Sequence, residues 1–499
     1  MRFKRLAVMM ALLSLSLMRP DQPAWAGEKA DIMPPIPGDF YEQVPFDRFI
    51  RFNESVPIGD LFDIRAFGAV GDGKTVNTRA INAAIQAAQA KGGGIVLIPD
   101  GDYVTGTIKL AGDITLHIAR NGILHASRDS ADYAPFALLL CENAANVVVQ
   151  GPGRILGDGE AWWNPPRKIP PRHHPETFSL EAAMAMHFDA KRQRAARRPS
   201  PFLQFRECTN LTVRNLIIEN SPGWTLLLNH CDGVHVKDVV INNNYHGPNT
   251  DGINVVGSNR VHIQHCFVAT GDDGIVLNNG LSPNQEPMSH IRISDCSVMS
   301  STNCFKIGTE TVNDITDVEV ADCTFFVDGI WPGGLSGMAI ESVDGAHVKR
   351  VNIRNVTVRN AMAPIFIRLG NRNRGKIKDR MGALTELTIR DVRAEGAESP
   401  CIISGIPGLY VKNVTLKNID ITYRQAKEQL DIKDPVPEVE TQYPEFAMFG
   451  DLPAYGLWAR HVDGLTVKNF KVTPRACNSR AKFVLQDVLR ASMPGKTEK

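Results

Sequence analysis

Two short acidic motifs near the middle of the chain carry its clearest chemical signal. Asn249-Thr250-Asp251 is followed by Gly271-Asp272-Asp273, so that Asp272 comes 21 residues after Asp251. In a coiled repeat of that period, equivalent residues stack about one strand spacing, ~4.8 Å, apart. Like charges at that distance are costly, and carboxyl groups a few ångströms apart are the catalysts of glycoside hydrolysis. The spacing therefore predicts a glycan-cleaving site made of Asp251, Asp272 and Asp273.

The elements that must hold these motifs recur along the chain. Nine segments share a period-two pattern of apolar residues, usually followed by an Asn or Asp that marks a turn, and most recur every ~23–36 residues. The segments begin at Leu211, Val234, Val261, Ile291, Val318, Val351, Leu387, Val414 and Leu465. Short strands at this spacing, with no helical pattern between them, are typical of an all-β, right-handed parallel β-helix. A leucine-rich repeat is disfavoured because its fixed leucine consensus is absent.

A short helix is expected to cap the N-terminal end of this β-helix. A strand and a Gly-rich turn at 62–73 come first, and Asn77 or Thr78 then caps a segment with one apolar face. That face consists of Ile81, Ala84, Ile85 and Ala88. Gly92-Gly93-Gly94 ends the helix before a buried strand at 95–98. Because these glycines follow a helix instead of opening one, they do not indicate a nucleotide-binding loop.

The N-terminus predicts export. Arg2, Lys4 and Arg5 precede an apolar stretch, 6–18, that is too short to span a bilayer, and Ala24-Trp25-Ala26 is a typical cleavage site. We therefore expect a signal peptide at 1–26 and a periplasmic or secreted protein without stable membrane insertion; a short membrane anchor is the alternative. The remaining predicted boundaries are an irregular lead-in at 27–60, the β-helix at 61–475 and a C-terminal tail at 476–499.

Composition limits the partners and the covalent cross-links. The net charge of +1 excludes a strong global field, so that no nucleic acid is expected and any attraction for an acidic partner must be local. Of nine cysteines, Cys266, Cys296 and Cys323 take the same place in successive repeats, which predicts a buried column of small apolar side chains. One or two disulfide bonds among the cysteines remain possible. No C-x-x-C pair occurs, so a cysteine metal site is not expected.

Two insertions interrupt the repeats, at 159–200 and 428–460. The first contains Trp162 and Trp163, and its residues 167–198 include eight Lys/Arg against three Asp/Glu, a local charge of +5. It is either a solvated basic loop or, through the tryptophans, a wall on which sugars stack. The second insertion surrounds the aromatic run from Tyr443 to Gly450. Loops of this length are usually functional or disordered, and these could close one end of a groove.

Together, the motifs resemble those of a known enzyme family. Asn249–Gly252 and Gly271–Gly274, at one-repeat spacing, resemble the paired motifs of polygalacturonases, glycoside hydrolase family 28, and the likeness covers most of residues 60–475. It implies a pectin-lyase-like β-helix that inverts the anomeric centre without a metal or cofactor. It also implies that Asp272 is the general acid and that Asp251 and Asp273 hold and activate the attacking water. The segments at 305–310 and 365–371 are similar to those of bacterial members that act on pectin from chain ends.

The sequence departs from the family pattern where the sugar is bound. Polygalacturonases usually carry a His-Gly motif in the next coil and an Arg-x-Lys motif after it, but 301–310 has no histidine and 337–342 has no basic pair. His246 is a candidate replacement for the histidine. The substrate is expected to be an acidic, pectin-type glycan. The predicted substrate-binding residues are Asn249, Lys306, Arg368 and Glu341.

Two other functions fit the same pattern. In a β-helical polysaccharide lyase, the aspartates would bind Ca²⁺ and Lys306 or Arg368 would abstract a proton. In a non-catalytic, glycan-binding β-helix, the aspartates would only form turn ladders. Chelation separates the lyase from the hydrolase, and loss of turnover with retained binding separates an enzyme from a binder.

Overall fold

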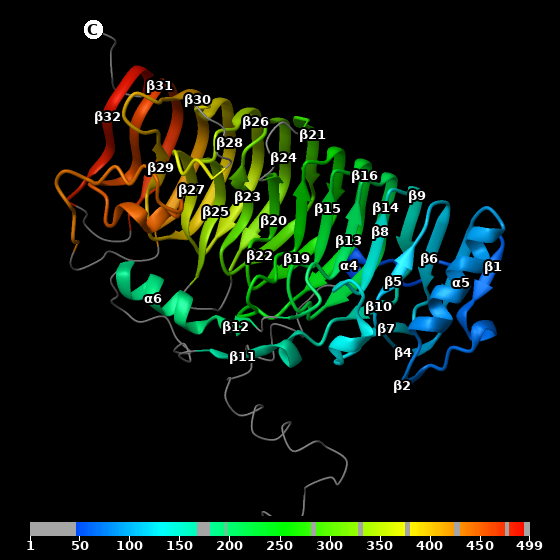
Figure 1. Ribbon diagram of the computed structural model, residues 1–499. Coiled ribbons are helices and arrows are strands. Elements are labelled where there is room, and N and C mark those ends of the chain that lie inside the picture. Colours follow the sequence, from blue (N-terminus) through cyan, green and yellow to red (C-terminus); the bar gives the residue numbers. More distant parts are fainter. Residues whose placement is uncertain are drawn as a thin grey trace, which may run out of the picture. The chain divides into compact units, whose positions relative to one another are not determined.

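The computed structural model describes residues 46–166, 180–194, 197–280, 286–327, 333–374, 380–423, 430–474 and 479–493. In Figure 1 the strands of residues 46–493 stack side by side in sequence order, from β1 at one end to β32 at the other. Nearly all pairings in this stack are parallel and join one coil to the next. The predicted parallel β-helix is therefore confirmed.

Three parallel ladders run along the stack. The first comprises β1 (Leu61–Asp63), β3 (Gly94–Ile98), β6 (Ile114–Ile118), β9 (Ala145–Gln150), β14 (Thr209–Glu219), β16 (Asp232–Asn242), β18 (Asn259–Gln264), β21 (Met288–Ser294), β24 (Ile315–Phe326), β26 (His347–Arg359), β28 (Ala383–Ala397), β30 (Val411–Tyr423) and β31 (Ala454–Thr473). The second comprises β5 (Ile108–Leu110), β8 (Leu139–Glu142), β13 (Leu203–Arg206), β15 (Leu226–Asn229), β17 (Ile253–Val256), β20 (Ile275–Asn279), β23 (Asn303–Thr311), β25 (Gly334–Ser342), β27 (Ala361–Leu369) and β29 (Cys401–Ser404). The third begins with β2 (Asp72–Val76), β4 (Gly101–Thr105), β7 (Gly122–Ala126) and β10 (Arg154–Leu156) and includes β19 (Phe267–Thr270) and β22 (Ser297–Ser300).

The nine predicted segments form the first ladder in register. Leu211 pairs with Val234, Val234 with Val261, and the series continues through to Leu465. The residue four positions after each start turns the chain into the third ladder with a left-handed backbone, for example Asp238 at φ 55° and Asn355 at φ 52°. Asn and Asp tolerate this conformation better than other non-glycine residues, which explains why they recur at these corners.

The ends of the stack carry the elements expected there, with two differences. Helix α5 (Thr78–Ala90) covers the first coils with its predicted apolar face (Figure 1). Asn77 precedes α5, but its side chain bonds the backbone of Val70 and Thr75 instead of capping the helix. At the other end β32 (Ala481–Ser492) pairs with β31, so the stack continues beyond residue 475 into the expected tail.

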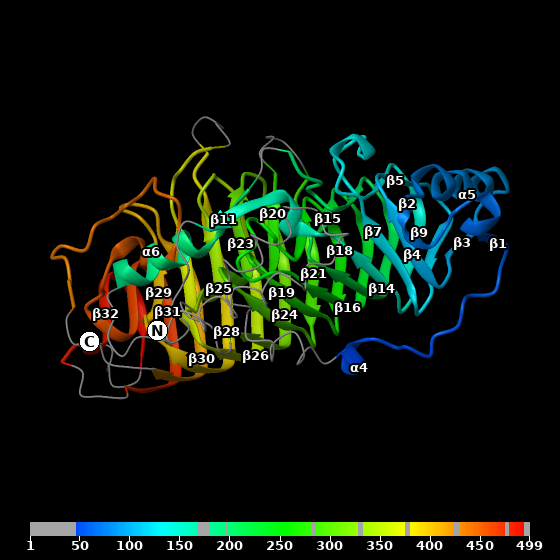
Figure 2. The ribbon, with the colours of Figure 1, turned by 90° about the horizontal axis from the view of Figure 1, so that it is seen from below.

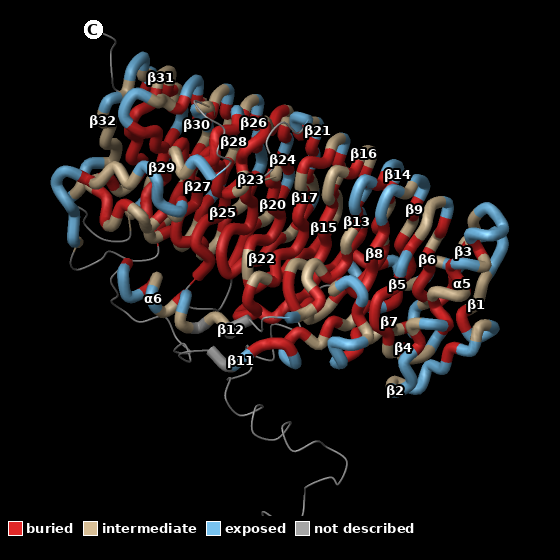
Figure 3. Tube along the Cα trace, viewed as in Figure 1, coloured by how far each residue is buried: buried red, intermediate tan, exposed pale blue. Residues whose placement is uncertain are grey.

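The cysteines and the tryptophans are parts of the core. Figure 3 shows the buried residues concentrated along the strands. Cys266, Cys296 and Cys323 are buried and free, as are the other cysteines of the described ranges, which confirms the apolar column. Trp162 and Trp163 are 8% and 3% exposed and pack with this core, so they do not form the suggested sugar-stacking wall. Of the basic run at 167–198, residues 167–179 and 195–196 lie outside the described residues.

A second core forms where the insertions cover the outside of the coils. The first insertion supplies η3 (Gly159–Trp162), β11 (Trp163–Pro166), α6 (Leu180–Ala190) and β12 (Arg192–Arg194), and the second supplies η4 (Phe446–Phe449). Leu180 and Ala183 of α6 join Phe446, Phe449 and Trp458 in one buried cluster with side chains of β25, β27 and β29. Seen from below in Figure 2, α6 runs across these strands.

The remaining short elements are α4 (Phe46–Phe49), η1 (Ile64–Phe67) and η2 (Ser130–Asp132). Residues 46–54, part of the predicted lead-in, lie on the outside of the coils, where the backbone amide of Arg51 donates to Asn215 Oδ1 at 2.7 Å. Residues 1–45, with the predicted signal peptide, lie outside the described part of the chain. Among the helices that the structure describes, none has the length and apolar character needed to cross a membrane.

Candidate active site

The three aspartates lie at the start of two neighbouring strands of the second ladder. Ile253 of β17 pairs with Ile275 of β20, and Asp251 and Asp273 precede these residues by two positions each. A backbone hydrogen bond of 3.0 Å runs from the amide that follows Asp251 to the carbonyl of Asp273. Asp251 and Asp273 therefore occupy equivalent places in successive coils, and Asp272 stands beside Asp273.

The structure brings the predicted carboxylates together. One carboxylate oxygen from each of Asp251, Asp272 and Asp273 lies within 4.8 Å of the others. Asp251 and Asp273 are 6% and 8% exposed, whereas Asp272 is only partly buried and so remains accessible to a ligand. The clustering expected from the 21-residue spacing is present. The catalytic roles of the three residues stay predictions.

Asp273 is held as a charged group by the next coil. Its Oδ1 accepts hydrogen bonds of 2.8 Å from the hydroxyl of Thr302 and from the side-chain amide of Asn303, and its Oδ2 lies 3.3 Å from Lys306 Nζ. Burial on its own would raise the pKa of Asp273, but the charge of Lys306 and these hydrogen bonds outweigh it and lower the pKa. Asp273 is therefore ionised at neutral pH, as a general base must be.

Asp251 has the opposite environment. Burial, followed by the charges of Asp272 and Asp273, raises its pKa well above the ordinary range. Its Oδ1 is buried and has no hydrogen-bond partner among the described residues. The raised pKa favours the protonated form of Asp251, whereas the family resemblance assigns the role of general acid to Asp272. Interacting carboxyls titrate as a group, so substrate binding can move the proton within the cluster.

Two lysines supply positive charge to the cluster. Lys191 Nζ lies 3.2 Å from Asp272 Oδ2, and Lys306 binds Asp273 as described above. Burial would lower the pKa of Lys306, but Asp273 and Glu341 overcome it and raise the pKa well above its usual value. Three carboxylates at this spacing have the chemistry to bind a hard cation such as Ca²⁺. Because two ammonium groups already neutralise them, the arrangement favours acid–base chemistry over cation binding.

Two of the other predicted substrate residues adjoin the cluster. Lys306 projects from the outer face of β23 and Glu341 from that of β25, and each is 1% exposed. Asn249 has a left-handed backbone, φ 50°, and its Oδ1 accepts a hydrogen bond of 3.4 Å from Arg198 in the first insertion. A direct contact of these residues with substrate stays a prediction.

Arg368, a predicted substrate-binding residue, forms hydrogen bonds within the protein instead. It is 1% exposed, its Nη1 donates to Ser404 Oγ at 2.8 Å and to the Gly405 carbonyl at 2.9 Å, and its Nη2 donates to the carbonyls of Glu438 and Val439 at 3.0 and 3.1 Å. Both terminal nitrogens are thus fully engaged. Arg368 fastens the second insertion to the coils, and a uronate would have to break these bonds to reach it.

Sequence reasoning missed the contributors from the insertions. Lys191 follows α6 and contacts Asp272, whereas Tyr443 and Glu445 precede η4. Tyr443 contacts Lys306, and Glu445 interacts electrostatically with Lys306 and Asp273. No pattern links these residues to Asp272, because loop positions carry no repeat. His246, weighed as a replacement for the missing histidine, is 8% exposed and packs edge-on against Tyr245 with ring centroids 5.3 Å apart.

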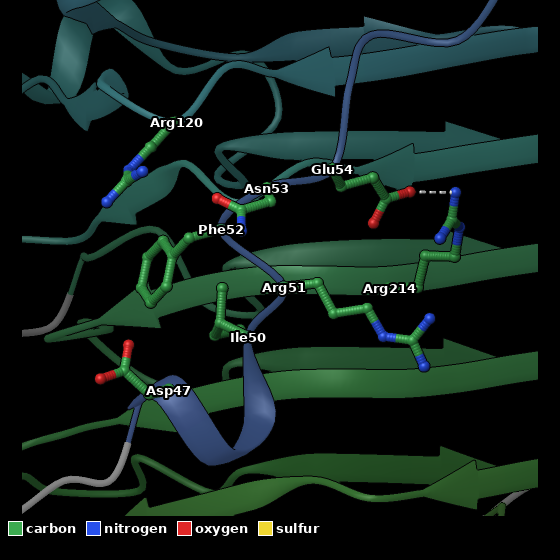
Figure 4. A pocket seen from close by; sticks show the side chains of 8 residues that line it. All are labelled: Asp47, Ile50, Arg51, Phe52, Asn53, Glu54, Arg120 and Arg214. Carbon is green, nitrogen blue, oxygen red and sulfur yellow. Dashed lines mark ion pairs between the residues drawn. The ribbon is translucent and has the colours of Figure 1, made fainter.

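A separate cavity of about 840 Å³ lies where residues 47–54 cross the outside of the coils. Figure 4 shows Arg51, Arg120 and Arg214 around it, with the carboxylate of Glu54 paired to Arg214. None of the predicted catalytic residues lines this cavity. Its lining carboxylates, Asp47 and Glu54, do not belong to a group of three clustered carboxylates such as Asp251, Asp272 and Asp273 form, so the aspartate cluster is the better candidate for the active site.

Two protein-family models match this chain. The family model "Glycosyl hydrolases family 28" matches residues 182–439, just over half of the chain, and "Rhamnogalacturonase A/epimerase, pectate lyase-like" matches residues 61–117. The protein is a glycoside hydrolase. It belongs to glycosyl hydrolase family 28.

Known relatives agree with this placement. A polygalacturonase of Persea americana is 25% identical over 67% of this chain and 68% of its own length, and one of Malus domestica is 28% identical over 60% of each. Among solved structures, the family 28 exopolygalacturonase of Yersinia enterocolitica has a TM-score of 0.66 and 17% identity, with 89% of this chain and 80% of that one covered. The exopolygalacturonase of Thermotoga maritima has a TM-score of 0.61 and 21% identity, with 85% and 95% covered. These likenesses confirm the right-handed parallel β-helix.

Proposed function

We propose that the enzyme hydrolyses glycosidic bonds of pectic polysaccharides from chain ends, with inversion of the anomeric centre, in the periplasm or outside the cell. The substrate class is supported by relatives that are named polygalacturonases and exopolygalacturonases. Export is supported by the signal-peptide pattern of residues 1–26 alone.

The observation that carries the reaction type is the asymmetry within the carboxylate cluster. Lys306, Thr302 and Asn303 lower the pKa of Asp273 and favour its ionised form, while burial and the neighbouring carboxylates raise the pKa of Asp251 and favour its protonated form. In the proposed reaction Asp251 first passes its proton to Asp272, which protonates the glycosidic oxygen. Asp251 and Asp273, then both ionised, hold the attacking water, and one of them accepts its proton. Asp272 suits the acid role because it is the most accessible of the three, and the proton can reach it from its neighbours.

Inversion is proposed from the family resemblance and not from the spacing. Oxygens within 4.8 Å are closer than the ~6.5–9.5 Å between carboxyl groups that is usual for inverting enzymes. The stereochemistry of the product is therefore an informative measurement.

Exo action is proposed from the two insertions. They meet over the outer face of β25, β27 and β29 in a shared core, next to the coil that carries Lys306. A wall at this place would stop a polymer from passing through the groove and leave room for a chain end.

A single reaction series tests these statements. Polygalacturonan and branched pectin are incubated with and without EDTA, and product size, product anomer by NMR and ultraviolet absorbance of unsaturated uronate are followed. We expect short products, an inverted first anomer, no absorbance gain and no effect of EDTA. Absorbance that depends on Ca²⁺ would show a lyase, and binding without any turnover would show a non-catalytic protein.

A further inference from the structure

A second polar cluster adjoins the three aspartates on the side of the second insertion. It consists of Lys306, Glu341, Arg372, Tyr443 and Glu445. Lys306 joins the two clusters, because its Nζ lies 3.3 Å from Asp273 Oδ2 and 3.4 Å from the Tyr443 hydroxyl. A sugar next to the cleaved bond would therefore meet this second cluster.

Both cationic side chains of this second cluster already form ion pairs with aspartates. Lys306 is paired with Asp273, and Arg372 Nη2 lies 2.6 Å from Asp344 Oδ2 with both side chains buried. Within the described ranges, neither Glu341 nor Glu445 has a cation at salt-bridge distance. The unmatched groups in the cluster are thus carboxyls.

Three buried polar atoms of the cluster have no hydrogen-bond partner in the described part of the chain. They are Glu341 Oε2, Glu445 Oε2 and Arg372 Nε. Gly308 makes room for the first, since a Cβ on Gly308 would lie 2.7 Å from Glu341 Oε2. Buried polar atoms without partners are costly, and they are rare outside sites that receive a ligand or an ordered water.

Tyr443 is an exposed aromatic residue of this cluster. The residue is 53% exposed, although Lys306 Nζ and Arg372 Cζ lie 5.5 and 5.4 Å from the centroid of its ring. An exposed aromatic ring beside buried acceptors offers the two contacts that a sugar uses: its apolar C–H face stacks and its hydroxyls donate.

We infer that Glu341, Glu445 and Tyr443 form a subsite for an uncharged glycosyl residue, whose hydroxyls donate to the two glutamates while its apolar face stacks on the tyrosine ring. The inference rests on the proposed hydrolysis and specifies the unit beside the cleaved bond. A uronate fits less well, because its carboxylate would find no unmatched cation and would approach two carboxyl groups.

The discrimination depends on pH. Burial, opposed by Lys306, raises the pKa of Glu341 to about 8 and that of Glu445 to about 7. The charged groups that face Glu341 are Lys306, Glu445, Asp273 and Arg372, and those that face Glu445 include Lys306, Asp273, Lys191 and Asp272. Below these pKa values the glutamates are neutral and tolerate a carboxylate; above them they repel it. Preference for the neutral sugar therefore grows as the pH rises.

The test uses two oligosaccharides that differ only in the terminal unit, a neutral hexose or the corresponding uronic acid. Affinity by calorimetry and kcat/KM are measured at pH 6 and pH 9 for the wild type, Glu445→Gln, Glu341→Gln and Tyr443→Ala. The control is Glu319→Gln. Glu319 is exposed, lies on β24 of the first ladder and pairs with Arg292. Thermal unfolding verifies that each variant folds.

The wild type and the control should favour the neutral oligosaccharide at least ~10-fold at pH 9 and by less at pH 6. Glu445→Gln should reduce this pH dependence, and Tyr443→Ala should weaken both ligands. Tighter binding of the uronate at pH 9, or the same pH dependence in Glu445→Gln as in the wild type, overturns the subsite. Tighter binding of the neutral ligand without cleavage of either would support the subsite and refute the proposed hydrolysis.

Discussion

The two faces of strands β23, β25 and β27 are both buried, but they differ in what covers them. Inward-facing Phe305, Met338 and Ile365 pair with one another and join the core that runs through the stack. On the outward face, Ala339 and Phe366 pack under the insertions, Lys306 and Arg368 form polar contacts, and Glu341 lies buried near the charge of Lys306. The inner face repeats one chemistry in every coil, whereas the outer face changes it from coil to coil.

This difference shows where function resides in a stacked fold. Each inner position must fill a similar space between apolar neighbours in the coils on either side, which favours apolar side chains. Each outer position meets a loop of its own, so a lysine, a glutamate and an arginine can stand in successive coils with separate tasks. Catalytic and binding residues are therefore expected on the outer face and in the insertions, and stability on the inner face.

The largest effect is expected from Asp272→Asn, which should lower kcat/KM by about 10²–10⁴-fold because an amide cannot donate the proton. Binding of an oligosaccharide, measured by calorimetry, should persist. Asp295→Asn is the matched control, since Asp295 stands at a left-handed corner, φ 53°, on the exposed side of the stack. If Asp272→Asn kept more than a third of the wild-type rate, the aspartate cluster would not be the active site.

Ile340→Ala tests the inner face alone. Ile340 is fully buried in β25, next to outward-facing Glu341, and its truncation should lower the free energy of unfolding by about 2–5 kcal/mol. Denaturant unfolding measures the loss. Because the change does not touch the outer face, kcat/KM of the folded variant should stay within about threefold of the wild type. A larger loss of turnover at unchanged stability would contradict the separation of the two faces.

The pH dependence of the free energy of unfolding should reveal the ionisation of the outward-facing Glu341. The folded pKa of Glu341 is raised to about 8 from an ordinary value near 4.5, so the folded state binds more protons between these values. The free energy of unfolding should therefore fall by several kcal/mol as the pH rises from about 4.5 through 8. Glu341→Gln should flatten this slope, and Glu319→Gln should not. An unchanged slope in Glu341→Gln would mean that Glu341 ionises normally.

The same contrast explains how much the sequence could predict. The nine strands, the capping helix, the cysteine column and the proximity of the aspartates all follow from periodicity, because stacking converts spacing into distance. Lys191, Tyr443 and Glu445 could not be placed this way, since each comes from an insertion whose path depends on packing against coils far along the chain. Arg368 was assigned by charge and region alone, and only the structure reveals the four acceptors that engage it.

The smallest effect on activity is expected from Arg368→Met. The change removes four hydrogen bonds to Ser404, Gly405, Glu438 and Val439, which should destabilise the second insertion. Thermal unfolding should shift downward, but KM for an acidic oligosaccharide should change less than about threefold, with no dependence on salt. If Arg368 instead bound a uronate of the substrate, its replacement would raise KM strongly. That increase would be smaller at high ionic strength, because salt screens the contact in the wild type. Measuring KM at low and high salt, below the unfolding temperature of the variant, therefore distinguishes an arginine that fastens a loop from one that binds substrate.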